Sequence, residues 1–183
     1  MAETKTKTKT PTTKKAVVND DLADEINFTD EDLEKRVTIH NISDWDLGLI
    51  LQNEVGERTL TRNSTLRLTR SELMAQLNIG NTALSGIDGK GSHATIYVED
   101  AATRRWLGFE TKDNPQAIYT DDVAHKLFAM TQAEFEKNLP IYIVTRAEKF
   151  ALKDAIKRLG LNDYQKMRYA AKYIGCPIDS FYD

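Results

Sequence analysis

The charges of the first 35 residues are segregated by sign, and this constrains the fold more than any other feature of the chain. Threonine alternates with lysine from position 4, no large apolar side chain occurs between positions 4 and 15, and the lysines there are Lys5, Lys7, Lys9, Lys14 and Lys15. Between positions 20 and 34 every charge is negative. Blocks of one sign repel themselves and bury little apolar surface. We therefore expect residues 1–35 to form an extended charged arm outside the folded core.

The Thr-Lys tract of this arm has two interpretations. One is a solubilising tail, because its composition cannot offset the entropy lost on ordering. The other is a contact arm, because alternation with a period of two and a high threonine content favour an extended strand that adds to the sheet edge of a neighbour.

The length and composition favour one soluble globular domain. A chain of 183 residues suits a single principal core plus an appendage. No apolar run approaches the roughly 20 residues that cross a bilayer, and no apolar segment follows the N-terminal lysines as in a secretory signal. Cys176 is the only cysteine, which excludes an intramolecular disulfide and fits a reducing compartment. We expect synthesis in the cytoplasm and no membrane partner.

Residues 36–112 are predicted to form a small antiparallel β-rich domain. Val37 and Ile39 alternate with polar neighbours, which predicts a half-buried strand over 36–42. Short strands at 47–52, 58–61 and 65–68, separated by turn residues, predict a meander of hairpins. Thr69 and Glu72 form a capping box that begins a two-turn helix ending before Gly80. Strands follow at 94–98 and 105–109, and a short acidic helix precedes the domain near residues 30–35.

Residues 113–183 are predicted to form a helical C-terminal segment packed on that domain. Thr120, Thr131 and Thr145 each precede a segment with helical spacing, and the last two are followed by Glu134 and Glu148 in capping-box positions. Helices over 146–159 and from about 163 to 174 are joined by a short turn, which predicts an antiparallel or angled pair. The predicted fold class is therefore α+β, divided into residues 1–35, 36–112 and 113–183.

No catalytic or metal-binding pattern is present. His40, His93 and His125 are scattered, without the spacing of a zinc site, and no G-x-S-x-G motif surrounds a serine. Cys176 lies between a glycine and a proline and is expected to be a small buried residue. We therefore predict a chain that is not an enzyme, with no catalytic residues, no metal and no cofactor.

Two further segments have simple structural interpretations. The loop Gly86–His93 is rich in glycine, but Gly91 separates Lys90 from Ser92, so the Walker pattern fails and a flexible hairpin or Ω-like loop is predicted. Asp44 and Asp46 flank Trp45 and are interpreted as turn formers beside a core tryptophan.

The strongest binding signal is basic and lies near the C-terminus. Lys149, Lys153 and Lys157 share one face of the predicted helix over 146–159 at i+4 spacing, with tyrosines following in the next helix. Such a stripe suits phosphates or an acidic protein surface. Its alternative is a solvated amphipathic face, and Asp163 at the start of the next helix would repel a nucleic-acid backbone. These three lysines and the five arm lysines are the predicted partner-binding residues.

The layout of a charged Thr-Lys arm, an acidic block, a compact β-rich middle and a helical tail resembles the small accessory virion proteins of tailed bacteriophages. The resemblance implies a structural head or head-tail component. Its domain would dock on a subunit lattice while residues 1–35 thread across neighbours. The partners would then be other protein subunits, in a homo- or hetero-oligomer, and the location would be the virion. The alternative is a nucleic-acid-associated protein that binds phosphates through the arm and the basic helices.

Overall fold

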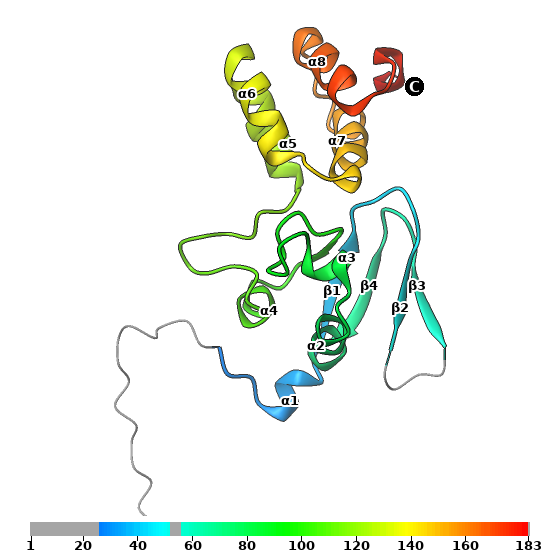
Figure 1. Ribbon diagram of the computed structural model, residues 1–183, viewed down its shortest axis with the longest axis vertical. Helices are drawn as coiled ribbons and strands as arrows, with labels where there is room; N and C mark the ends of the chain where they lie inside the picture. The colour runs from blue at the N-terminus through cyan, green and yellow to red at the C-terminus, as the bar shows by residue number, and fades with distance from the viewer. Residues whose placement is uncertain (1–25, 52–55, 183) are drawn as a thin grey trace, which may run out of the picture.

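The computed structural model describes residues 26–51 and 56–182 (Figure 1). In these residues it contains eight α-helices and five antiparallel strands, with the β-rich part first and a group of helices after it. The predicted α+β class is therefore confirmed. The five arm lysines lie outside the described residues. The boundaries predicted at 35/36 and 112/113 stay predictions.

Three of the strands form one antiparallel sheet. The central strand β1 (Arg36–Asn41) pairs with β4 (Thr65–Thr69) on one side and with β5 (Ile96–Val98) on the other. Val37 and Ile39 are buried, whereas Thr38 and His40 of the same strand are half-buried. The predicted two-residue period is thus present.

The other two strands form a separate hairpin, β2 (Leu47–Ile50) with β3 (Glu57–Leu60). The predicted meander is therefore wrong at one point, because β4 leaves β3 and pairs with β1 instead. A turn with Asn63 at φ 46° redirects the chain there, and the Asn41 backbone N–H donates to the Ser64 carbonyl at 2.9 Å.

Short helices surround the sheet. They are α1 (Asp30–Leu33), α2 (Arg70–Asn78), α3 (Thr82–Ser85) and α4 (Ala101–Trp106). The capping box predicted at Thr69 is present, because Thr69 Oγ1 accepts from the Glu72 N–H and the Glu72 carboxylate accepts from the Thr69 N–H. None of the α1 residues is buried, although Phe28 just before it makes an edge contact with Trp106 at 5.4 Å between ring centroids.

The strand predicted over 105–109 is wrong, because most of this segment belongs to α4 and the turn that ends it. The Asp100 carboxylate caps this helix by accepting from the Thr103 N–H at 2.8 Å. Ala101 and Ala102 then supply high helix propensity. Gly108, at φ 77°, follows the helix and returns the chain.

The C-terminal part consists of four helices and a short 3-10 turn. They are α5 (Asp121–Ala129), α6 (Gln132–Tyr142), α7 (Arg146–Arg158), α8 (Tyr164–Ile174) and η2 (Ile178–Phe181). The capping boxes predicted for α6 and α7 are both present. Gly175, in the left-handed region at φ 86°, ends α8.

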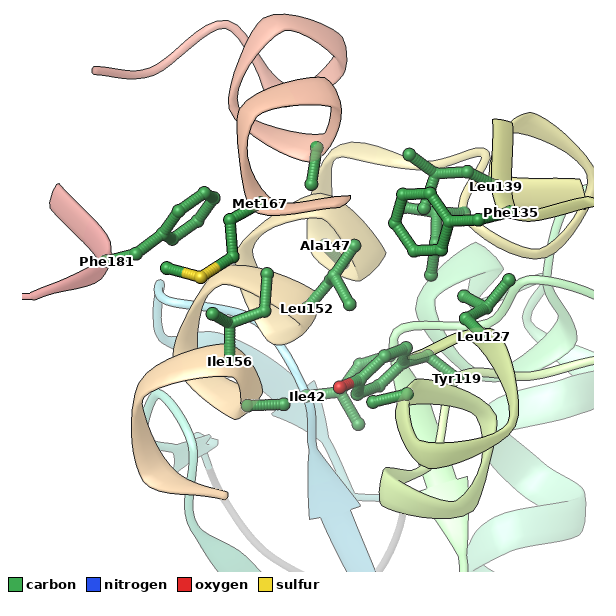
Figure 2. Close-up of a cluster of buried hydrophobic side chains, with 14 of the residues drawn as sticks. Ile42, Tyr119, Leu127, Phe135, Leu139, Ala147, Leu152, Ile156, Met167 and Phe181 are labelled. Carbon is green, nitrogen blue, oxygen red and sulfur yellow. The ribbon is translucent and has the colours of Figure 1, made fainter. Parts of the chain in front are cut away.

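The buried side chains form two clusters, where a single principal core was expected from the chain length. One cluster lies between the sheets and the short helices around them. The other lies among the C-terminal helices, and Figure 2 shows Phe135, Leu152 and Met167 meeting there from α6, α7 and α8. Ile42 and Ala94 are the buried members that the β-rich part contributes to this second cluster. The apolar stripes of the helices mostly face one another, so each part buries its own apolar surface.

Candidate binding surfaces

Two of the predicted lysines come together in a hollow on one side of α7. Lys149 and Lys153 line a space of about 370 Å³ with Arg146, whereas Lys157, one turn further along, does not line it. The other lining residues are Phe150 of α7 and the end of α8 at Ile174, Gly175 and Cys176. We call this the cationic hollow.

Two of the three cations of the cationic hollow lie over aromatic rings. The Arg146 guanidinium lies 5.4 Å from the ring centre of Trp45 and 5.3 Å from that of Phe150. Lys149 Nζ lies 4.4 Å from the ring centre of Tyr173. Within the part of the chain that the structure describes, Arg146, Lys149 and Lys153 form no ion pair with a carboxylate. The hollow therefore presents three positive charges that its own surroundings leave unneutralised.

Cys176 and Trp45 differ from their predicted environments. Cys176 is half-buried at the wall of the cationic hollow, so its expected burial is wrong. Trp45 is also half-buried: it packs against the edge of the C-terminal cluster, and the Arg146 guanidinium lies over its ring. Asp44 lies in the bend over 43–45, whereas the Asp46 carboxylate accepts from the backbone N–H of the distant Arg62 at 2.8 Å, so the turn role predicted for Asp46 stays a prediction.

A larger groove of about 940 Å³ lies on another side of α7, between the helices and the three-stranded sheet. Its sheet side consists of His40, Tyr97 and Glu99, and its helical side comes from the start of α5 and from the middle and end of α7. Five carboxylates line it, against two guanidinium groups, and we call it the acidic groove. The charged residues are Asp44, Glu99, Asp121, Asp122, Asp154, Arg62 and Arg158.

One guanidinium neutralises part of this charge. Arg158 donates two hydrogen bonds to the Asp121 carboxylate, at 2.7 and 2.8 Å, and a third to Asp154 at 3.3 Å. The hydrogen bonds from Arg158 hold the pKa of Asp121 below its usual value. No such pair forms at Asp44, Glu99 or Asp122 among the residues that the structure describes. The groove thus keeps a net negative charge.

Tyr119 contributes a buried hydroxyl to the same groove. The residue is only 4% exposed, and its hydroxyl has no hydrogen-bond partner within residues 26–51 and 56–182. Figure 2 shows the hydroxyl directed towards Ile42, which also lines the groove. Burial raises the pKa of Tyr119, and the carboxylates of Asp121 and Asp154 raise it further.

Asn41, which sequence reasoning did not single out, fixes the loop that contributes Asp44 to the groove. Its side chain is fully buried, and its amide donates to the carbonyls of Trp45, Leu60 and Thr61 at 2.8 to 3.2 Å. Its carbonyl oxygen accepts from the Ser43 N–H and hydroxyl. No local motif signals this role, because the partners lie up to 20 residues away.

The glycine-rich loop is tied to the helices more firmly than predicted. His93 Nδ1 lies 2.8 Å from Glu148 Oε1, although the two residues are 55 positions apart. Glu148 is fully buried, and its second oxygen accepts from the backbone N–H groups of Val144 and Thr145. Glu148 therefore both caps α7 and links it to the loop that ends at His93.

The described residues contain no group of three or more histidine, cysteine or acidic side chains arranged for a metal ion. None of the helices among them has the length and apolar content needed to span a membrane. No family model, curated protein or solved structure matches this chain.

Proposed function

We propose that this chain is a non-enzymatic structural subunit of a protein assembly, of the kind that its layout resembles in tailed-bacteriophage virions. The observation that supports the proposal most is that two surfaces of opposite charge border α7. The acidic groove lies on one side of this helix and the cationic hollow on another. Phe150 lines both, so the two surfaces are neighbours on one helix.

Unpaired charges of one sign repel one another unless a partner of opposite sign covers them. Each surface keeps three such charges, Asp44, Glu99 and Asp122 in the groove and Arg146, Lys149 and Lys153 in the hollow. The sequence supplies complementary segments, a lysine block before position 16 and an acidic block from position 20. Several weak contacts of this kind add up when many copies assemble, which suits a lattice subunit.

Sedimentation velocity of the full chain tests this proposal. We expect species heavier than the 20.8 kDa monomer, increasing with concentration. A variant with glutamine at the five arm lysines should shift to the monomer, whereas a variant with arginine at the same positions should still associate. A wild-type chain that stays monomeric at every concentration contradicts the proposal.

Nucleic-acid binding is the second candidate, and the cationic hollow favours it. Three unneutralised cations beside Phe150 offer phosphate contacts and an aromatic face for a base. Fluorescence anisotropy with single- and double-stranded DNA, at about 50 and 200 mM salt, measures it. If the hollow binds phosphates, R146Q/K149Q/K153Q weakens binding and flattens its salt dependence. The matched control K137Q/R168Q/K172Q changes three exposed cations outside the hollow and should have neither effect. DNA binding that is absent at both salt concentrations rejects this candidate.

A further inference from the structure

The acidic groove carries charge that the described chain does not compensate. Arg158 is already engaged by Asp121 and Asp154, which leaves Arg62 as the other guanidinium facing Asp44, Glu99 and Asp122. A volume of about 940 Å³ is at the upper end of ligand pockets, which run from about 300 to 1,000 Å³. The groove therefore suits an extended cationic ligand in preference to a single ion.

Tyr119, one of the residues that line the groove, also has a buried hydroxyl without a hydrogen-bond partner among the described residues. A buried phenol hydroxyl without a hydrogen bond costs about 1 to 3 kcal/mol. The Tyr119 hydroxyl is in this state on the side of Ile42, and it accepts a hydrogen bond from any N–H that reaches it. An ammonium group, with three donors and no acceptor, has the matching chemistry.

We infer that the acidic groove binds the lysine-rich segment of residues 4–15 from a second copy of this chain. The inference rests on the proposed function. In an extended strand alternate side chains lie about 6.7 Å apart on one face. If the segment binds as such a strand, Lys5, Lys7 and Lys9 lie on the face towards the carboxylates and the intervening threonines lie on the other face.

A second copy is the occupant because of where the described chain begins. The described chain begins at residue 26, shortly before α1, and α1 lies at the end of the molecule opposite to the helices α5 to α8 (Figure 1). The groove lies between those helices and the sheet. An arm that starts at the end away from the groove can enter the groove of a second copy that lies next along the long axis. Such head-to-tail contacts build rings or filaments.

A peptide titration tests the occupant directly. The receptor is the full chain with its five arm lysines changed to glutamine, so that its own arm does not compete. The probe is a fluorescein-labelled peptide of residues 2–18, followed by anisotropy at about 50 mM salt. We expect saturable binding, which a peptide with glutamine at the same five positions loses.

Variants of the receptor locate the contact. D44N/E99Q/D122N should weaken binding about tenfold, since each exposed ion pair contributes about a factor of two. The control D113N/E136Q/D179N makes the same change in net charge at exposed sites outside the groove and should leave binding within about twofold. Y119F should also weaken binding. Because removal of an unpaired buried hydroxyl is also expected to stabilise the fold, a thermal melt of the same variant measures that second effect separately. Equal binding by the two triple variants overturns the inference.

The outcomes separate this inference from the proposed function. If the wild-type chain self-associates but the peptide does not bind the groove, the groove assignment is wrong and the assembly proposal stands. If the peptide binds the groove while the full chain is a monomer at all concentrations, the arm occupies the groove of its own chain. In that case both the second-copy assignment and the assembly proposal are wrong.

Discussion

Replacement of Glu148 by alanine should destabilise the protein much more than the same change at Glu134. Both glutamates occupy the third position of a helix and accept from the backbone N–H of the capping threonine, at 2.9 Å for Glu148 and 3.1 Å for Glu134. Glu134 is exposed, so water replaces its bonds, whereas Glu148 is fully buried and also holds Val144 N–H and His93. The two variants therefore compare one motif in two environments.

The expected loss of stability follows from the backbone and side-chain groups that each variant leaves without a hydrogen-bond partner. Loss of an exposed cap costs about 1 kcal/mol or less. E148A leaves two backbone N–H groups and a ring nitrogen unpaired, at about 1 to 3 kcal/mol for each group that stays buried, and we expect a loss of about 3 kcal/mol.

Urea unfolding followed by circular dichroism measures this difference. With a slope of about 2 kcal/mol per molar urea, the midpoint should fall by about 1.5 M in E148A and by no more than about 0.5 M in E134A. Equal midpoint shifts in the two variants would refute the role assigned to Glu148.

Two further predictions concern the glycine-rich loop and the groove. Gly91 and Gly89 both have positive φ, but a Cβ on Gly91 would lie 2.5 Å from Phe109 Cγ, while one on Gly89 meets no atom within 4 Å. G91A should therefore lower the melting temperature clearly more than G89A, and equal melting temperatures would show that the contact is not tight. Arg158 lowers the pKa of Asp121, so the pair stabilises the fold above the usual aspartate pKa of about 3.9 and this contribution is lost as the pH falls through the lowered pKa. R158Q should return the Asp121 pKa towards 3.9, as followed by carboxyl NMR shifts. Because the pair is half-exposed, this variant should lose no more than about 1 kcal/mol of stability at neutral pH. An unchanged Asp121 pKa would exclude Arg158 as the cause of the lowered pKa.

The sequence predicts those parts of the fold that depend on neighbours along the chain. Thr69, Thr131 and Thr145 cap their helices through bonds that span three residues, and these were predicted correctly. The strand over 36–42 was predicted from its alternation. The α4 helix was missed because a short segment ending in Leu107 and Phe109 also fits a strand, and the Asp100 cap was not recognised.

The candidate surfaces were predicted only where one helix forms them. Lys149 and Lys153 lie one turn apart on α7, so their spacing was sufficient. Lys157 does not join them because the opposite wall, formed by Ile174 to Cys176, faces only the first part of α7. The acidic groove combines β1, β5, α5 and α7, and nothing in the sequence relates His40 to Asp121 before the chain folds.

Disulfide trapping between two different chains tests the central claim most directly. In a background with Cys176 changed to serine, one chain carries P11C in the arm, on the same alternating face as Lys5, Lys7 and Lys9, and the other carries A151C in the groove. Under mild oxidation we predict a linked dimer in the mixture, and little linkage when A151C is replaced by A133C on the exposed face of α6. Equal linkage to both sites, or linkage only within a single chain that carries P11C and A151C together, would contradict the binding of the arm by a neighbouring copy.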